Sequence, residues 1–471
     1  MRLRTNQIVA TLISISAGPS CAQPCSHTET GTLLPPDANT IFMGSCSATS
    51  GNVLIVGAPK DNTNGLAAGA AHIYRRVGSS WVYEDKLLAV AETGDDEFGA
   101  AVAIDGDIAV VGASLDSDPD GRTYAGSAYV FEFDGVSWNQ SQKLIAPDQA
   151  SFDRFGYSVA ISGDSILIGS PFDSDNGQNS SGSVYVFTRE GAKGWVFDTK
   201  LHASDPRQFS NFGDGIAVSG DTAIIAASRD REIGIESGAA YIFRRDASGW
   251  SEQTKLQSND IAADDRFGYS VAISGDAIMV GAPGEDSGGE FAGAAYAFRF
   301  NGTNWTQEDK MRPTAITTGD VFGTSVAIQD DLVIVGSISS VIGGLGDGMG
   351  SAYVYRYTGF DWDQEDAIIP AGAVPFDWFG ASVSLAGDTA FIGAPFTLDA
   401  GMLEVGKVFV FDLGCLPCIA DTNGDGMLSP ADFSAWIAAF NTMASECDQN
   451  GDGICSPADF SAWVANYNAG C

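Results

Sequence analysis

One pattern recurs seven times along the chain and constrains its fold more than any other feature. The clearest copy, residues 266–283, opens with Phe-Gly, continues as an alternating apolar segment into a Gly-Asp turn, and returns as a second apolar segment that ends in Gly-Ala-Pro. The first residues of successive copies lie 55 or 57 positions apart. Self-similarity at one period indicates an array of equivalent structural units. The copies begin at Met43-Gly44, Phe98-Gly99, Phe155-Gly156, Phe212-Gly213, Phe267-Gly268, Phe322-Gly323 and Phe379-Gly380.

The residue pattern predicts four strands in each unit. In the second copy, apolar residues alternate over 101–104, and Asp-Gly-Asp at 105–107 is typical of a hairpin turn. Residues 108–111 return as a nearly continuous apolar run, which is the pattern of a strand covered on both faces. Residues 126–131 and 138–144 are predicted to be the third and fourth strands.

The fourth strand of most units carries a tryptophan and, five residues later, a lysine. Four antiparallel strands in about 55 residues is the size of a propeller blade. No segment of these repeats shows a sustained helical period, which excludes a helical solenoid. The pairs are Trp81/Lys86, Trp138/Lys143, Trp195/Lys200, Trp250/Lys255 and Trp305/Lys310, and in the sixth unit Trp362 is followed by Ala367.

Two details favour a closed ring of seven blades over an open stack. The seventh unit ends after its third strand, residues 406–411, whereas residues 29–36 precede the first unit at the right distance to be the missing fourth strand. We therefore expect the N-terminal segment to close blade seven, which removes exposed sheet edges. The residue three positions after each opening Phe or Met is small, as strands converging on an axis require. These residues are Cys46, Ala101, Ser158, Gly215, Ser270, Ser325 and Ser382.

The Phe-Gly…Gly-Ala-Pro pattern resembles the FG-GAP repeat of integrin alpha-chain propellers and their bacterial relatives, over roughly residues 29–414. The resemblance implies a mainly β fold, a seven-bladed β-propeller of four-stranded antiparallel blades. Many FG-GAP blades carry a calcium loop between their first two strands. Here that place holds only short turns, such as residues 105–107 and 274–276. They offer too few oxygen ligands, so we expect no calcium in them.

Charge and the N-terminus indicate an exported protein. The chain of 471 residues has 60 acidic and 24 basic side chains, a formal net charge of −36, which argues against nucleic-acid binding. Residues 1–22 have the basic start, short apolar core and small-residue cleavage site of a signal peptide. Cys21 could instead be a lipidated cysteine. An export route would place the remaining seven cysteines in an oxidising compartment.

Two twelve-residue loops in the tail, residues 415–471, have the oxygen spacing of calcium loops, with Gly426 and Gly453 at the sharp turn. Position twelve is Asp in both, shorter than the usual Glu. Two copies in frame argue against a pair of acidic turns that bind nothing. The predicted Ca²⁺ ligands are Asp421, Asn423, Asp425, Met427 (backbone), Ser429 and Asp432 in the first loop, and Asp448, Asn450, Asp452, Ile454 (backbone), Ser456 and Asp459 in the second.

Each loop is predicted to run into a helix, giving a small α-helical C-terminal domain with two calcium loops. Pro430 is expected at the first helical position, after a Ser429 cap. The apolar faces are predicted to consist of Phe433, Trp436, Ile437 and Phe440, and of Phe460, Trp463, Val464 and Tyr467.

The tail is similar to a dockerin, a two-loop calcium module that attaches secreted proteins to cohesin domains. Its cysteines resemble those of a dockerin variant at the C-termini of exported bacterial proteins. The resemblance implies a partner, a cohesin-like or other surface receptor, that contacts the helix starts around Ala431, Ser434, Ala458 and Ser461.

The cysteines leave alternatives open. Cys418, Cys447, Cys455 and Cys471 allow three pairings that the sequence does not separate. If residues 29–36 lie beside residues 406–411, Cys25 falls close to Cys415, and we predict a disulfide between them. Cys46, at a crowded inner position, is expected to be a buried free thiol.

We find no sequence signature of an active site. The three histidines are His27 near the N-terminus, His72 within a third strand and His202 after a Lys-Leu pair; the last two are interpreted as satisfied strand residues. A blade loop at residues 116–121 has alternating oxygen ligands and a glycine, and residues 173–177 are a shorter relative. An acidic loop is the default interpretation of both, and calcium the alternative.

The sequence therefore favours a secreted, non-catalytic binding or scaffold protein. Residues 23–414 would form the propeller, which recognises a protein or glycan through its loops. The calcium-dependent tail would dock it or act as a sorting signal. The alternative is an extracellular polysaccharide-active enzyme with the same tail. A carboxylate cluster in the central channel would favour the enzyme, and a channel lined with small residues would favour binding.

Overall fold

The computed structural model describes residues 27–37, 39–90, 94–117, 120–175, 177–339, 348–370, 374–399, 403–414, 422, 430–442, 447, 456 and 459–464. One compact unit consists of residues 27–412, and residues 413–471 belong to a second. The two units are described separately below.

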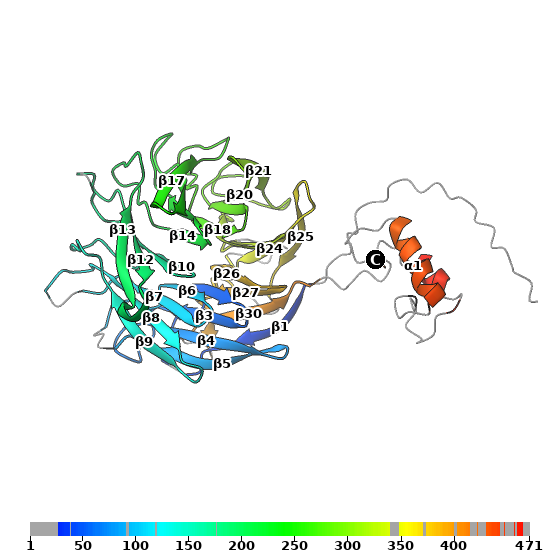
Figure 1. The fold of residues 1–471 in the computed structure, drawn as a ribbon, viewed down its shortest axis with the longest axis horizontal. Coiled ribbons are helices and arrows are strands. Elements are labelled where there is room, and N and C mark those ends of the chain that lie inside the picture. The colour runs from blue at the N-terminus through cyan, green and yellow to red at the C-terminus, as the bar shows by residue number, and fades with distance from the viewer. Residues whose placement is uncertain are drawn as a thin grey trace, which may run out of the picture. The chain divides into compact units, whose positions relative to one another are not determined.

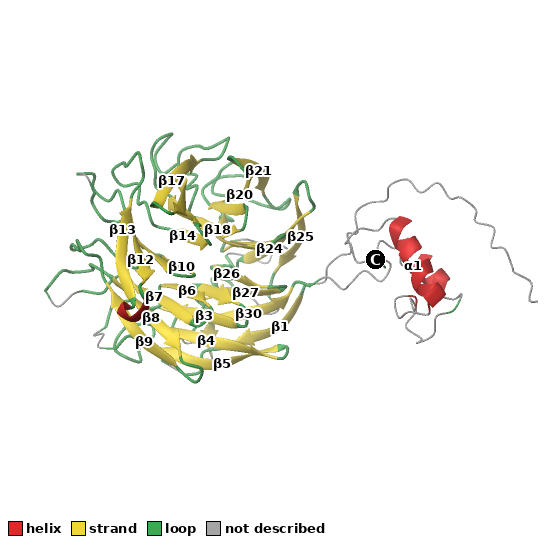
Figure 2. Cartoon of the chain, in the orientation of Figure 1, coloured by secondary structure: helices red, strands yellow, loops and turns green. Residues whose placement is uncertain are grey.

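The unit of residues 27–412 is a ring of seven four-stranded antiparallel sheets (Figure 1), as predicted. Blades 1 to 6 are meanders whose first strand lies next to the central axis and whose fourth lies at the rim (Figure 2). Their strands, blade by blade, are β2 Ser47–Ser50, β3 Val53–Ala58, β4 Ala70–Val77 and β5 Ser80–Leu87; β6 Ala101–Asp105, β7 Ile108–Ala113, β8 Ser127–Phe133 and β9 Trp138–Leu144; β10 Val159–Ser162, β11 Ser165–Ser170, β12 Ser183–Arg189 and β13 Trp195–Leu201; β14 Ile216–Ser219, β15 Thr222–Ala227, β16 Ala239–Asp246 and β17 Gly249–Leu256; β18 Ser270–Ser274, β19 Ala277–Ala282, β20 Ala294–Phe300 and β21 Trp305–Met311; β22 Phe322–Gln329, β23 Leu332–Ser337, β24 Ser351–Tyr357 and β25 Trp362–Ile368.

Blade 7 is closed by the N-terminal strand, as predicted. Its sheet runs in the order β1 (Thr28–Leu33), β30 (Lys407–Asp412), β27 (Thr389–Ala394) and β26 (Ser382–Ala386). In the β1–β30 ladder, Thr28 lies opposite Asp412 and Leu33 opposite Val408. The strand is shorter than the predicted 29–36 because Pro35 and Pro36 have no N–H group to extend the ladder. Three short elements lie outside the blades: η1 Gly191–Lys193, and the paired β28 Leu398–Asp399 and β29 Leu403–Glu404.

The hydrophobic core lies between neighbouring blades. Ile55 and Ile73 of blade 1 belong to the same buried cluster as Phe98 and Tyr129 of blade 2. The opening phenylalanine of each Phe-Gly pair is fully buried and packs against an aromatic ring of its own blade's third strand; the Phe98 and Tyr129 ring centroids are 5.5 Å apart. The phenylalanine of the Phe-Gly motif thus packs in the core between neighbouring blades.

The glycine that ends the second strand allows blades to approach closely. A Cβ added to Gly112 would lie 2.0 Å from the carbonyl oxygen of Gly156 in the next blade. In blade 4 the glycine and the small inner residue exchange places: Ala226 stands at the glycine position, and Gly215 is the inner residue that faces it. A Cβ added to Gly215 would lie 3.3 Å from the Cβ of Ala226. The pair keeps its combined volume, so the blade spacing is retained.

The antiparallel meander sorts the loops to two faces of the ring. The Phe-Gly bends, the loops between second and third strands and the blade-to-blade linkers share one face, which we call the FG face. The hairpin turns of each blade share the opposite face, which we call the hairpin face. Functional side chains on long loops therefore concentrate on the FG face.

Helix α1 (Pro430–Thr442) is the described helix of the tail, and residues 459–464 are also helical. It starts at Pro430 as predicted. Trp436, Cys447 and Trp463 form its buried cluster, against which Phe433 and Phe440 pack. The predicted apolar faces were partly wrong: Ile437, Phe460 and Val464 are exposed. Phe460 nevertheless contacts the Phe433 ring. Tyr467 lies outside the described residues.

Candidate functional site

A cavity of about 250 Å³ lies on the propeller axis, lined by the inner strands of all seven blades. Its size follows from the small inner residues, since bulkier side chains would fill the axis. The seven residues predicted from the sequence all line it: Cys46, Ala101, Ser158, Gly215, Ser270, Ser325 and Ser382.

Most of these inner residues also tie the ring together, a role that sequence reasoning missed. The Ser158 hydroxyl donates to the Gly213 carbonyl oxygen of the next blade at 2.7 Å, and the Ser382 hydroxyl donates to that of Gly44 at 2.9 Å across the closure. Ser270 and Ser325 make the equivalent bonds. The sequence signal for this role was the recurrence of serine three residues after the opening Phe in several units, together with the glycine that follows the opening Phe or Met of the next unit.

The residues that line the cavity include few groups that could act in catalysis. Cys46 is a free thiol, as predicted, but it is half-buried and not buried, and its Sγ donates to the Gly99 carbonyl oxygen at 3.2 Å. Burial raises the pKa of Cys46 to about 12, so it is a poor nucleophile at neutral pH. The lining residues, all within the described blades, include no Asp, Glu or His. The lining matches the small-residue channel that the sequence interpretation associated with binding.

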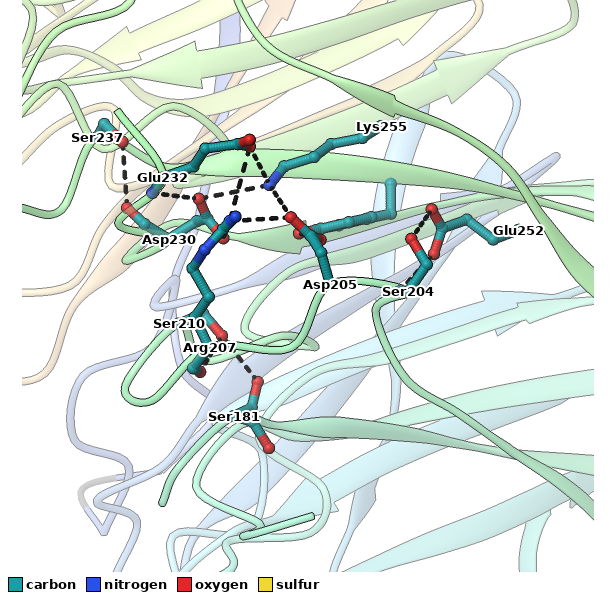
Figure 3. Close-up of polar contacts among 11 residues, drawn as sticks. Ser181, Ser204, Asp205, Arg207, Ser210, Asp230, Glu232, Ser237, Glu252 and Lys255 are labelled. Atoms are coloured by element: carbon teal, nitrogen blue, oxygen red, sulfur yellow. Dashed lines mark hydrogen bonds and ion pairs between the residues drawn. The ribbon is translucent and has the colours of Figure 1, made fainter. Parts of the chain in front are cut away.

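The largest polar clusters lie on the FG face, where a lysine of the outer strand meets carboxylates. Figure 3 shows the cluster of blade 4, in which Lys255 Nζ lies 2.9 Å from Asp205 Oδ2 and 2.8 Å from Glu232 Oε2. Asp230, whose side chain is 1% exposed, lies 3.5 Å from the same nitrogen. The ammonium group is 5.1 Å from the centre of the Tyr241 ring beneath it. A lysine thus occupies the position that a bound cation would otherwise take.

In blades 1, 3, 4 and 5 these clusters link the blade to its predecessor. One carboxylate comes from the loop after the second strand of the same blade, and the other from the linker that enters from the preceding blade. In blade 3, for example, Lys200 Nζ lies 2.7 Å from Asp173 and 2.8 Å from Asp148. Equivalent contacts join Lys86 to Asp37 and Asp61, and Lys310 to Asp260 and Glu285.

The charge states of the clusters are set by their partners. Burial would lower the pKa of Lys255, but the hydrogen bonds that its ammonium group donates to Glu232 and Asp205 raise the pKa above its ordinary value. Burial alone would raise the pKa of Asp205, but the hydrogen bond that it accepts from Lys255 outweighs this effect and lowers the pKa. An ammonium group that stays charged cannot act as a general base or form a Schiff base. We therefore interpret the clusters as structural.

The repeats show that the lysine and the loop carboxylate are kept or lost together. Blade 6 has Ala367 in place of the lysine and Ala315 in place of the linker carboxylate, and Ser340 follows its second strand where the other acid would stand. Ser340 lies outside the described residues. Blade 7 has Thr32 and Thr397 at the lysine and acid positions. Blade 2 has Ala91 at the linker position but keeps the Lys143–Asp116 pair, so mutual charge compensation holds for that pair.

The two blade loops considered for calcium belong to these clusters. Lys143 Nζ lies 2.6 Å from Asp116, and Lys200 Nζ lies 2.7 Å from Asp173. Each loop's first carboxylate is therefore already paired with an ammonium group. Residues 118 and 119 of the first loop, and residue 176 of the second, lie outside the described residues.

The histidines differ from their predicted roles. His72 lies in β4 opposite Lys86, at the position where blades 2 to 6 have tyrosine. Burial lowers the pKa of His72 to about 4, so the ring is neutral. Only its Nε2 has a partner among the described residues, Thr40 Oγ1 at 3.4 Å, so the interpretation of a satisfied histidine was half right. His202 is exposed. His27, to which no role was assigned, contacts Asp366.

Most of the predicted calcium ligands lie outside the described residues: Asp421, Asn423, Asp425, Met427, Ser429, Asp448, Asn450, Asp452 and Ile454. Asp432 lies in α1, and its side chain is likewise not described. Ser456 and Asp459 lie at the start of the second helix. The buried Asp459 carboxylate accepts from the Ser456 N–H at 2.7 Å, a helix-capping arrangement. Cys25 and Cys415 are also outside, so the predicted disulfide stays a prediction.

Comparison with known proteins adds one family. The family described as FG-GAP repeat matches more than half of the chain. Each match starts at the tryptophan of an outer strand and ends in the third strand of the following blade. No curated protein matches the chain. The matched residues are 81–131, 138–187, 195–243, 250–298, 305–355 and 362–411.

Proposed function

Because this chain belongs to the FG-GAP repeat family, we propose that it is a non-catalytic binding or scaffold protein whose FG face recognises a protein or glycan. The observation that carries the proposal is the distribution of exposed aromatic rings. Phe152, Phe209, Phe291, Phe376 and Trp378 are all on FG-face loops, and each is between 41% and 65% exposed. Aromatic side chains displayed on a rigid scaffold are typical of binding surfaces.

The ring supplies the rigidity that such a surface needs. The lysine clusters anchor FG-face loops to the blades, and the serine bonds join neighbouring blades at the axis. Loop side chains held in this way lose little conformational freedom when they bind a partner. The cavity lining, with small residues and no carboxylate, supports binding over catalysis.

The tail would dock or sort the protein in a calcium-dependent way. Support comes from the two calcium loops of the sequence, with Asp421 and Asp448 at their first positions, and from helix α1, which starts directly after the first loop. The proposed tail partner is a cohesin-like or other surface receptor.

We place the protein outside the cytoplasm, secreted or attached to the cell surface, on the pattern of residues 1–22 and because FG-GAP repeats are typical of extracellular proteins. In the part of the chain that the structure describes, no helix is long and apolar enough to cross a membrane.

A pull-down with the full mature chain tests this proposal. The bait would be incubated with the surface fraction of the producing organism, with calcium and with chelator. We expect one partner to be lost from the variant Phe152→Ser/Phe376→Ser, and a second to be lost on chelation. The control variant Val136→Ser/Phe360→Ser changes exposed residues of the hairpin face and should keep both. Capture of no partner, or release of sugar from a polysaccharide by the purified chain, would contradict the proposal.

A further inference from the structure

The FG face over blades 3 and 4 carries arginines that lack ion-pair partners. The chain has 60 acidic side chains and only 24 basic ones, so unpaired cations are unexpected. Yet among the described residues Arg154, Arg229 and Arg231 form no ion pair, whereas nearby Arg207 and Arg266 do. Arg229 and Arg231 are exposed, and Arg154 is half-buried.

Two of these guanidinium groups are stacked on aromatic rings. The Arg154 guanidinium lies 4.9 Å from the centre of the Phe172 ring, and that of Arg231 lies 5.5 Å from the Phe209 ring. A stacked guanidinium uses its flat face for the ring and keeps its N–H edge for hydrogen bonds. Such an edge matches the paired oxygens of a carboxylate or sulfate.

Two exposed tyrosines lie on the same face, each directly after a Phe-Gly pair. Tyr157 lines the cavity and is 40% exposed, and Tyr269 is 47% exposed. Arg154 and Tyr157 flank the same ring, because the Arg154 guanidinium lies over Phe172 and the Tyr157 and Phe172 ring centroids are 6.1 Å apart. Arg229 stands in blade 4 at the position that Phe172 has in blade 3.

The nearest carboxyl group is engaged elsewhere. Asp214 accepts hydrogen bonds from the backbone N–H and the hydroxyl of Ser228. Burial raises the pKa of Asp214 to about 7, so a large fraction of this carboxyl is uncharged at neutral pH. Asp214 bonds to Ser228 and forms no ion pair with Arg229 among the described residues, so the guanidinium keeps donors for an external anion.

We propose that this surface binds the carboxylate or sulfate groups of an acidic polysaccharide, with Arg154 and Arg229 contacting the acid groups and Tyr157 and Tyr269 packing against sugar rings. The inference depends on the proposed function and specifies its ligand. Exposed rings beside guanidinium groups suit a ligand that is both ring-shaped and anionic.

Calorimetric titration of the full mature chain in calcium buffer tests the inference. The probes are oligogalacturonate and sulfated chondroitin fragments, which separate carboxylate from sulfate as the recognised group. Neutral malto-oligosaccharides of equal length and poly-glutamate are the comparison ligands. We expect at least one acidic saccharide to bind, and the variant Arg154→Gln/Arg229→Gln to bind it at least tenfold more weakly.

The control variant is Arg76→Gln/Arg244→Gln, which makes the same charge change at arginines without ion pairs on outer parts of blades 1 and 4. It should bind as the unaltered chain does, and both variants should keep the unaltered melting temperature. Equal binding by the two variants, equal binding of the neutral saccharide, or equal binding of poly-glutamate would overturn the inference. If no acidic saccharide binds but the pull-down still yields a partner that depends on the FG face, the inference fails and the proposed function stands.

Discussion

His27 Nδ1 lies 2.9 Å from Asp366 Oδ2, a contact between residues 339 positions apart. The same imidazole has its Nε2 3.6 Å from Glu365 Oε2, and its side chain is fully buried. Asp366 and Glu365 belong to β25 of blade 6, whereas His27 directly precedes β1 of blade 7. The N-terminal segment therefore does more than complete its own sheet, because it also fastens blade 7 to blade 6.

This contact predicts a pH-dependent contribution to stability. Burial would lower the pKa of His27, but the adjacent Glu365 carboxylate and the hydrogen bond to Asp366 outweigh it and raise the pKa above 6.5. A raised pKa in the folded state stabilises the protein below the unfolded value, and the stabilisation is lost as the pH rises through the folded value. We expect His27→Gln to lower the free energy of unfolding by about 1.5 kcal/mol at pH 5.5 and to have little effect at pH 9.

Urea unfolding at the two pH values measures this difference. The control is His202→Gln, since His202 is exposed and its Nδ1 lies 3.8 Å from Asp175. That variant should match the unaltered chain at both pH values. A His27→Gln effect that is the same at pH 5.5 and pH 9 would show that the imidazolium is not what fastens the blades.

The lysine clusters predict a large cost for removing one ammonium group. Lys255→Met would leave Asp230, which is 1% exposed, with only the Arg207 guanidinium, 3.5 Å away, as a cation, and poorly paired buried charges are costly. We expect a loss of about 3 kcal/mol in the free energy of unfolding, measured in urea. Lys193→Met removes the 73%-exposed lysine that pairs with Glu190, and should cost less than about 0.5 kcal/mol. Similar losses in both variants would refute a structural role for the cluster.

Close approach between blades predicts that glycine cannot be replaced at the end of a second strand. Gly112→Ala would place a methyl group 2.0 Å from a backbone carbonyl oxygen, which only a shift of the next blade could relieve. We expect a loss of about 3 kcal/mol or a failure to fold. Gly31→Ala, with no atom within 4 Å of the added Cβ, is the matched control and should melt at the unaltered temperature. Equal melting temperatures for both variants would contradict the packing described for the ring.

The tail is predicted to hold two calcium ions and the propeller none. Calorimetric titration should find two sites in the full chain and none in Asp421→Ala/Asp448→Ala. Removal of calcium by chelator should lower the melting temperature of the tail, since calcium at about a hundred times its Kd adds about 2.7 kcal/mol for one site. The control Asp107→Ala/Asp388→Ala removes the same charge from hairpin turns of blades 2 and 7 and should retain both sites. Full retention of calcium by the first variant would disprove the assignment.

Most of the ring could be predicted because its information is local and repeated. Six Phe-Gly bends and one Met-Gly bend, with a Gly-Asp turn in five of the units, marked the strand ends, and the unfinished seventh unit indicated that residues 29–36 complete it. The small inner residues were predicted from sterics alone, and the hydrogen bond of Ser158 to the next blade was not. That bond joins residues of two different repeats, so no single repeat displays it.

The polar network was harder to predict because its members are far apart in the sequence. Lys200 is 52 positions from Asp148, and nothing near either residue indicates the other. The signal that existed was their joint replacement in blade 6, by Ala367 and Ala315. The contact of His27 had no such signal, since it occurs once and no other repeat has a counterpart to compare. The helix faces of the tail were predicted too broadly: Ile437 and Val464 follow the apolar period, but so short a helical unit has too little core to bury them.

Closure of the ring by the N-terminal strand is the central structural claim, and hydrogen exchange measured by mass spectrometry tests it most directly. The amides of Thr28–Leu33 bond only to β30, so their protection reports that one ladder. We predict that this peptide exchanges as slowly as Trp195–Leu201, the corresponding outer strand of blade 3. Complete exchange of Thr28–Leu33 within seconds, with Trp195–Leu201 still protected, would contradict the closed seven-bladed ring.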